Sequence, residues 1–322
     1  MDVAIGFDTS CYTTSVAAVD ANGNVIAFQR LLLPVKSGQR GLRQSEAVFV
    51  HIRQMPGLVE LMRSEMADAT IVVASASTKP REGENSYMPV FTVGEGHART
   101  LAGALNIPFY PFTHQQGHIA AGQLGNPPIG ERFVALHLSG GTTELVLSEA
   151  GQLTLLGGSL DLHAGQLIDR VGVAMGLPFP AGPTLEKLAM ANDEPVMAAI
   201  PASLAHADLD CHLSGAETRC QQWIEKGEMH QELIAAEVFD LLARTVARML
   251  TAACKETDTH CALVVGGVAS SVLVRQLVVK RLEKMGCRID LRFGKPEYSG
   301  DNAAGIAWLG MKRYLTDTAV CD

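Results

Sequence analysis

The pattern that most constrains the fold is a strand–turn–strand–turn–strand outline that occurs twice in the chain. Residues 3–30 contain three apolar runs, and Asn22-Gly23 lies in the turn between the second and the third. Residues 133–157 repeat this outline, although the two copies share little identity. An Asn-Gly pair between apolar runs is typical of a β-hairpin. The sequence therefore predicts two similar units that each begin with a β-hairpin.

Helices and buried strands follow each predicted hairpin. Apolar residues spaced by three and four positions indicate helices, and short apolar runs bounded by turn residues indicate strands. Residues 125–130 contain Gly, Asn and Pro and are the best linker between the units. This order predicts an α/β protein with a cleft between two lobes. The predicted helices are 41–67, 94–105, 165–176, 184–193, 231–256, 271–286 and 302–315, and the further strands are 71–74, 109–110, 261–266 and 289–293.

Composition limits the classes of protein to consider. The chain has 322 residues, 47% hydrophobic, which is too apolar for a disordered chain. Its net charge of −8 gives no global attraction for nucleic acid, so such a contact needs a local basic stretch. Seven cysteines without a C-x-x-C pair, and no signal peptide, favour a cytoplasmic protein. Residues 21–45 are the basic stretch, with Arg30, Lys36, Arg40 and Arg43 and no acid.

Three turns rich in Gly, Ser and Thr each follow an apolar strand. They are residues 8–15, 139–143 and 266–271. Glycine lets backbone N–H groups approach phosphate oxygens, and Ser and Thr hydroxyls add donors. One such turn alone is more typical of an ordinary tight turn, whereas three across two similar units favour a nucleotide-binding cleft. The predicted nucleotide contacts here are Asp8, Ser10, Ser139, Gly140, Gly141, Gly266, Gly267 and Ser271.

A second feature is the histidine pair His114 and His118. Residues four apart lie on one face of a helix, so both imidazoles can reach one metal ion. Gln115 stands where the metalloprotease pattern H-E-x-x-H has its general base, which disfavours that class of enzyme. Two surface or N-cap histidines on a helix are the alternative explanation, and it stays open.

Asp301, just before the last apolar helix, is the candidate third ligand. Two histidines and one carboxylate make an open facial arrangement that suits Fe(II) and also fits Zn. The open positions would let the metal take nucleotide phosphates. The alternative is a helix N-cap, a place that Asp favours and that contributes about 1 kcal/mol.

Residues 165–183 contain the last candidate positions. Asp169 lies in an otherwise apolar helix, where its carboxylate could hold a ribose hydroxyl or pair with Arg170 or another neighbour. Residues 180–183, Pro-Ala-Gly-Pro, form a rigid turn in which Gly182 could pass close to a sugar. Both explanations of Asp169 remain open.

These motifs, in this order, resemble the TsaD family of tRNA threonylcarbamoyladenosine synthases, once misnamed O-sialoglycoprotein endopeptidases. The family belongs to the sugar kinase/Hsp70/actin (ASKHA) superfamily. The resemblance runs from Ile5 to about Arg313. It is carried by Gly6–Cys11, His114–His118, Ser139–Gly141, Asp169, Gly176-Leu177, Gly182-Pro183, Leu213–Gly215, Gly266–Val268 and Asp301–Ala304.

The chain departs from the family pattern at several of these motifs, and it resembles a divergent paralogue. Tyr12 and Thr13 stand where the family has two acidic residues. Thr142 replaces a histidine and Ser271 an asparagine. Residues 78–84 replace a Gly-Pro-Gly loop.

The resemblance implies an ASKHA fold with duplicated mixed β-sheets and ATP between two lobes, 1–128 plus 301–322 and 129–300. It implies Fe(II) or Zn at the positions matching His114, His118 and Asp301. It also implies that ATP or threonylcarbamoyl-AMP, with Mg possible, contacts the positions matching residues 139–141, Asp169 and Gly182.

The implied reaction moves a threonylcarbamoyl group from threonylcarbamoyl-AMP to the N6 amine of the adenosine beside the anticodon of tRNA. The metal would polarise or position the mixed anhydride. TsaB/TsaE-like proteins are the implied partners, in a homodimer or heterodimer. The alternative is a non-catalytic ASKHA scaffold that binds nucleotide and partners a TsaD- or TsaB-type protein.

Overall fold

The computed structural model describes residues 1–34, 42–66, 68–83, 86–300 and 303–319. The chain divides into two compact units, which are Met1–Pro127 with Glu297–Asp322 (unit 1) and Pro128–Pro296 (unit 2). Lys36, Arg40, Asp301 and Asn302 lie outside the described residues. Within the described ranges, every helix is too short or too polar to cross a membrane.

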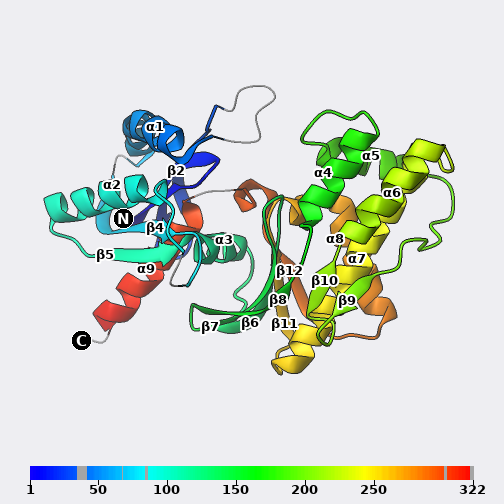
Figure 1. Ribbon diagram of the computed structural model, residues 1–322. Coiled ribbons are helices and arrows are strands. Elements are labelled where there is room, and N and C mark those ends of the chain that lie inside the picture. The colour runs from blue at the N-terminus through cyan, green and yellow to red at the C-terminus, as the bar shows by residue number, and fades with distance from the viewer. Residues whose placement is uncertain (35–41, 67, 84–85, 301–302, 320–322) are drawn as a thin grey trace. The chain divides into compact units, whose positions relative to one another are not determined.

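Unit 1 is built on a mixed sheet with the strand order β3-β2-β1-β4-β5, of which Figure 1 labels β2, β4 and β5. The first three strands are antiparallel neighbours, and the hairpin of β2 and β3 is the one that the Asn-Gly turn predicts. Strands β4 and β5 continue the sheet in parallel with β1. The strands are β1 (Asp2–Thr9), β2 (Thr13–Asp20), β3 (Val25–Leu32), β4 (Thr70–Lys79) and β5 (Phe109–Thr113), and the helices are α1 (Gln44–Glu65), α2 (Phe91–Leu105), α3 (His114–Gln123) and α9 (Ala304–Ala319).

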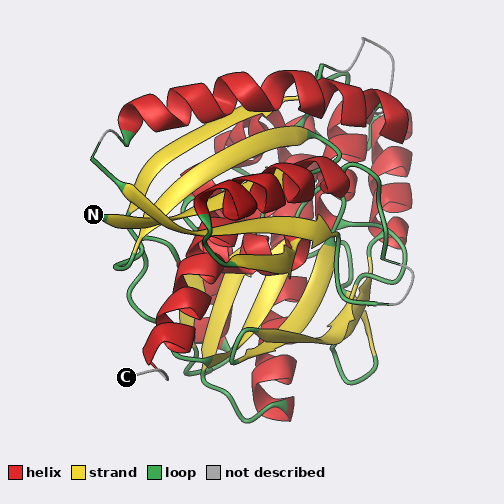
Figure 2. Ribbon diagram, turned by 90° about the vertical axis from the view of Figure 1, so that its left-hand side faces the viewer, coloured by secondary structure: helices red, strands yellow, loops and turns green. Residues whose placement is uncertain are grey.

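Alternation along β1 decides which helices cover which face of this sheet. Val3, Ile5 and Phe7 are buried in a cluster with residues of α1 and α2. Ala4, on the other face, is buried with Met311 of α9. Successive side chains of a strand point to opposite faces, so large residues meet one helical layer and small residues meet the other. Figure 2 shows the twisted strands with helices packed against them.

Helix α9 packs very close to β1 because Gly6 faces it. A Cβ atom at Gly6 would lie 2.4 Å from Ala307 N and 2.5 Å from Ala303 O. Any larger residue would therefore push the helix backbone away from the strand. The glycine of the first motif thus has a packing role in unit 1.

Unit 2 repeats the sheet of unit 1. Its strand order is β12-β11-β6-β7-β8, in which β6, β7 and β8 are antiparallel neighbours and β11 and β12 continue in parallel with β6. The predicted repeat is therefore confirmed. The strands are β6 (Arg132–Leu138), β7 (Thr143–Glu149), β8 (Gln152–Gly158), β11 (Cys261–Val265) and β12 (Asp290–Phe293), with a separate pair β9 (Ser203–Ala205) and β10 (Asp210–His212).

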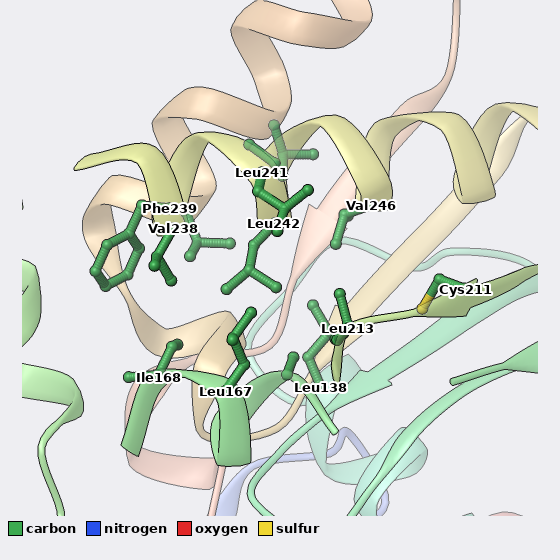
Figure 3. Packing of buried hydrophobic residues seen from close by; sticks show 14 of the residues in the cluster. Leu138, Leu167, Ile168, Cys211, Leu213, Val238, Phe239, Leu241, Leu242 and Val246 are labelled. Atoms are coloured by element: carbon green, nitrogen blue, oxygen red, sulfur yellow. The ribbon is translucent and has the colours of Figure 1, made fainter. Parts of the chain in front are cut away.

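The core of unit 2 forms around one long helix, α7. Phe239, Leu242 and Val246 of this helix pack with Leu138 of β6 and Leu167 of α4 in one cluster (Figure 3). Each such fully buried side chain contributes about 1.5–3 kcal/mol. The helices are α4 (Ala164–Ala174), α5 (Gly182–Ala191), α6 (Ser214–Lys226), α7 (Gln231–Glu256) and α8 (Val272–Lys284).

The sequence missed helix α6 and the short strands β9 and β10. Helix α6 buries only Ala216, Cys220 and Trp223, so its apolar stripe is narrow and includes two small residues. Strands β9 and β10 have three residues each and, among the described residues, pair only with one another, apart from an isolated bridge at Cys211. The predicted helices and strands are all present. Helix α7 has the predicted ends, and most other elements have shifted ends; α2, for example, begins at Phe91 rather than at residue 94.

Candidate functional site

Unit 1 brings the two predicted metal-binding histidines together at the start of α3. Thr113 caps this helix by accepting a hydrogen bond from Gln116 N, and the Gln116 side chain accepts one from Thr113 N in return. The Nε2 atoms of His114 and His118 lie 3.0 Å apart. His118 is buried and His114 is partly buried, packed against the ring of Phe91. The prediction that both imidazoles share one face of a helix is confirmed.

Asp8, which the sequence predicts as a nucleotide contact, lies against this histidine pair. It is fully buried near the carboxyl end of β1. Its Oδ1 accepts hydrogen bonds from Ser77 Oγ of β4 and from His114 Nδ1, the latter at 2.9 Å. Among the described residues, Asp8 Oδ2 has no hydrogen-bond partner. Asp8, Ser77 and His114 thus lie at the carboxyl ends of three neighbouring parallel strands, β1, β4 and β5, at one edge of the sheet.

The first Ser/Thr turn follows Asp8 and is closed by its own side chain. Ser10 Oγ accepts hydrogen bonds from Tyr12 N and Thr13 N. The buried imidazole of His51 on α1 supports the turn, with Nε2 2.9 Å from Ser10 O and Nδ1 2.7 Å from Thr14 Oγ1. Burial lowers the pKa of His51. The sequence analysis missed His51, whose neighbours in the chain suggest only an ordinary helix.

The histidine pair fits a divalent metal as far as the described residues extend. Imidazole nitrogens bind Zn and Fe at about 2.0–2.1 Å, so two nitrogens 3.0 Å apart can meet one ion. The buried Asp8 Oδ2 without a hydrogen-bond partner adds negative charge beside the pair. No third histidine, cysteine or acid completes a metal-binding group within the described residues. The predicted third ligand, Asp301, lies outside them.

In unit 2 the Ser-Gly-Gly turn meets the start of helix α4. Ser139 N donates to Thr142 O at 2.8 Å, which closes the turn after β6. Gly165 N donates to Ser139 O, and a Cβ atom at Gly165 would lie 2.7 Å from Gly140 Cα. Glycine at position 165 lets the first turn of α4, where the helix dipole is positive, touch the Ser-Gly-Gly turn.

The third small-residue turn meets the end of the same strand, β6. Gly266 has φ = +100°, a conformation that favours glycine, and a Cβ atom there would lie 2.3 Å from Leu138 O. Gly267 and a short 3₁₀ turn then lead into helix α8. The second and third turns therefore lie side by side at one edge of the unit 2 sheet.

Asp169 and Gly182 are also brought together. Asp169 Oδ1 accepts a hydrogen bond from Ala181 N at 2.8 Å, directly before Gly182 at the start of α5. Burial raises the pKa of Asp169, and the backbone hydrogen bonds from Ala181 and Gly182 lower it in part. Of the alternative partners, the neighbour Ala181 is therefore the one that Asp169 bonds, whereas Arg170 Nη1 pairs with Glu217 Oε2 at 3.1 Å.

Ser271 is the N-cap of helix α8 and bonds to a residue that the sequence analysis missed. Its Oγ accepts a hydrogen bond from Val274 N and donates to Glu186 Oε1 at 2.8 Å. The same Glu186 oxygen accepts a hydrogen bond from Leu273 N at 2.8 Å. Glu186 lies four residues after Gly182 on α5, so its spacing from the Gly-Pro turn is the signal that could have found it.

We expect Ser271→Ala to lower the free energy of unfolding by about 1 kcal/mol, because α8 loses its N-cap. Urea unfolding followed by circular dichroism measures this change. Ser271→Asn is the matched control, since asparagine also caps helices and should recover most of the loss. Equal stability of the Ala variant and the wild type would contradict the capping role.

Asp161 is a second missed residue, and it links the end of β8 to the start of α6. It accepts hydrogen bonds from Leu162 N and Leu213 N, and from Ser214 Oγ at 2.5 Å. Burial acts to raise the pKa of Asp161, but these hydrogen bonds outweigh it and lower the pKa to about 2. The Leu213–Gly215 motif is therefore held in place by one carboxylate.

This carboxylate predicts a specific pH dependence of stability. A lowered pKa in the folded chain contributes stability above the unfolded value of 3.8, and this contribution is lost as the pH falls towards about 2. Asp161→Asn should be less stable at pH 7, and its urea midpoint should fall less steeply between pH 4 and pH 2. The exposed Asp193→Asn is the control. Parallel curves for Asp161→Asn and the wild type would refute the assignment.

The described site residues thus form two local groups. In unit 1, His114 contacts both Asp8 and His118, and Ser10 follows Asp8 in the first turn. In unit 2, contacts run from the Ser139 turn to Gly165 of α4, from Asp169 of α4 to α5, and from Glu186 of α5 to Ser271 of α8. The starts of three helices, α4, α5 and α8, border this second group.

Comparison with known proteins identifies the family. The model of the family described as TsaD: tRNA N6-adenosine threonylcarbamoyltransferase matches residues 88–308. A protein of Bordetella petrii with the name tRNA N6-adenosine threonylcarbamoyltransferase is 30% identical, over 97% of this chain and 90% of its own length. A protein of Thiobacillus denitrificans with the same name is also 30% identical, over 97% of this chain and 91% of its own length.

Solved structures agree on the fold. The ROK hexokinase from Thermus thermophilus superposes with a TM-score of 0.58 over 98% of this chain and 99% of that chain, at 14% identity. At such an identity the likeness concerns the fold alone, and it is the two-unit α/β fold of the ASKHA superfamily. The matches in sequence, which extend over almost the whole length, show that the chain belongs to the TsaD family.

Proposed function

We propose that this chain is an acyltransferase that modifies tRNA. In this proposal it moves a threonylcarbamoyl group from threonylcarbamoyl-AMP to the N6 amine of the adenosine beside the anticodon. Membership of the family over nearly the full length of the chain carries the proposal, because the relatives bear the name of this transferase. The contact between His114 and His118 at the start of α3 supports it from the geometry of the site.

The reaction is an acyl transfer from a mixed anhydride. The N6 nitrogen attacks the carbonyl carbon and forms a C–N bond, while the C–O bond to the phosphate of AMP breaks. AMP leaves with that electron pair, and the nitrogen gives up one proton to solvent. In unit 2, the Ser139–Gly141 turn is suited to hold the phosphate of the nucleotide through Gly140 N, since Ser139 N and Gly141 N donate within the turn. The starts of α4 and α8 are suited to the same role, and Asp169 and Gly182 to contact with the ribose.

We assign a divalent metal, Fe(II) or Zn, to His114, His118 and Asp301. Two imidazoles and one carboxylate are a donor set that both metals accept. The short Nε2–Nε2 distance and the buried Asp8 Oδ2 support a positive charge at this place. When bound, such a metal polarises or positions the anhydride.

A non-catalytic scaffold is the second candidate function, and the first turn favours it. Tyr12 and Thr13 stand where the resemblance implies two acids; the Tyr12 side chain is exposed and Thr13 is buried. In this role the chain would bind nucleotide and a TsaD- or TsaB-type partner without turnover. For the transferase, we propose TsaB/TsaE-like proteins as partners.

A turnover assay distinguishes the two functions. The purified full chain is incubated with threonylcarbamoyl-AMP and unmodified tRNA, with and without TsaB- and TsaE-type proteins. The tRNA is then digested to nucleosides, which are separated and identified by mass spectrometry. Modified adenosine in either mixture, absent when the chain is omitted, supports the transferase. ATP-dependent stabilisation of the chain without any product in either mixture supports the scaffold and refutes the transferase.

A further inference from the structure

The contact between Asp8 and His114 has a consequence for the metal site. Asp8 is completely buried, and the neighbours of its Oδ1 are Ser77 Oγ and His114 Nδ1. A carboxylate can only accept hydrogen bonds, so the hydrogen of His114 stays on Nδ1. The lone pair of this imidazole is then on Nε2, the atom that lies 3.0 Å from His118 Nε2.

We propose that Asp8 is a positioning residue for the metal, not a contact of the nucleotide. It selects the tautomer of His114 and fixes the ring so that Nε2 faces the same point as His118 Nε2. Ser77, on the next parallel strand, donates a hydrogen bond to the Asp8 carboxylate. The group of contacting residues therefore comes from β1, β4 and the helix that follows β5. The inference rests on the proposed role of His114 and His118 as metal ligands.

The burial of Asp8 supports this role over a structural one. A buried carboxylate oxygen without a partner costs free energy, and Oδ2 is such an atom among the described residues. A purely structural position would be more stable with a neutral side chain. A positive charge beside the histidine pair offsets the cost, and histidine ligands commonly donate their second nitrogen to a carboxylate of this kind.

The test compares metal binding by Asp8→Asn, Asp8→Ala and the wild type, all as the full chain. Each protein is stripped of metal and titrated with Co(II), and binding is followed by calorimetry and visible absorption. We expect the affinity for Co(II) to fall by about 10–100-fold in Asp8→Ala, and by less in Asp8→Asn, which keeps an acceptor. Asp8→Asn is close in shape to aspartate and keeps the test valid where Asp8→Ala is unfolded in thermal melts.

Asp20→Asn is the matched control for the loss of a buried carboxylate. Asp20 is also buried in unit 1, but it ends β2 and binds Asn22 and Asn24 in a turn. Its replacement should lower stability and leave the affinity for Co(II) unchanged. Loss of stability alone therefore cannot mimic the effect expected of Asp8.

A second readout needs no metal. In the stripped protein with ¹⁵N-labelled histidine, long-range ¹H–¹⁵N spectra report which nitrogen of His114 carries the hydrogen. The wild type should show the Nδ1–H form, and the Asp8→Ala variant should lose this preference. An unchanged tautomer in Asp8→Ala, or Co(II) affinities of both variants within twofold of the wild type, would overturn the inference.

Binding of ATP separates this role from the earlier expectation for Asp8. We expect both Asp8 variants to bind ATP as the wild type does. A loss of ATP affinity with intact Co(II) affinity would show that Asp8 contacts the nucleotide and would contradict its role at the metal site. Neither titration uses tRNA or threonylcarbamoyl-AMP, so a wild type that binds Co(II) through Asp8 but transfers nothing leaves the inference standing while the proposed function fails.

Discussion

Replacing both His114 and His118 with alanine is expected to remove the bound metal and to lower the rate of threonylcarbamoyl transfer by about 10³-fold or more. Both replacements are on α3, whose cap depends on Thr113 and Gln116 rather than on the histidines. The helix should therefore remain folded. Removal of a metal that stabilises charge in a transition state costs several kcal/mol, and each 1.4 kcal/mol is tenfold in rate.

Elemental analysis of the purified chain and the turnover assay measure the two effects. The double variant His206→Ala/His260→Ala removes the same number of imidazoles from exposed positions in unit 2 and is the control. ATP binding should survive in both variants, because the residues that we assign to the nucleotide in unit 2 are unchanged. Unchanged metal content after replacement of His114 and His118 would refute their assignment as metal ligands.

The repeated sheet could be predicted because its signals are local. Alternation in Val3, Ile5 and Phe7 marks the first strand, and the turn at Asn22-Gly23 joins the second strand to the third. Residues 133–157 repeat the outline of three apolar runs separated by turns. Helix α6 could not be predicted in this way, because Cys220 and Trp223 are too few to give a clear period. Elements that tertiary contacts stabilise, such as α6, cannot be predicted from the local sequence pattern.

The site shows the same division. The spacing of His114 and His118 predicts that they share a helix face, since four residues close one helical turn. The contact of His114 with Asp8 joins residues 106 positions apart. It depends on β1, β4 and β5 being parallel neighbours, so that their carboxyl ends meet at one edge. Only the order of strands, which no local pattern encodes, brings the carboxylate to the imidazole.

Gly305→Ala is expected to have the largest effect on stability, because this glycine lies where α9 touches α3. A Cβ atom at Gly305 would lie 1.9 Å from Gly117 O and 2.6 Å from Ala121 N, and both are backbone atoms that cannot rotate away. Helix α9 would have to move off α3. Overpacking of a tight core contact typically costs about 1–3 kcal/mol, and a clash with the backbone should reach the upper end of this range or exceed it.

The same substitution should weaken metal binding without replacing a ligand, because Gly117, which the new Cβ atom would meet, lies between His114 and His118 on α3. Urea unfolding and Co(II) titration measure the two effects. Gly96→Ala is the control: a Cβ atom there has nothing within 4 Å on helix α2, so alanine should stabilise the chain by about 0.5–1 kcal/mol. If Gly305→Ala unfolds at the wild-type urea concentration, the α3–α9 contact does not position the histidine pair. If it is destabilised but binds Co(II) normally, α3 keeps its histidines in place by the Thr113 cap and the Asp8 contact alone.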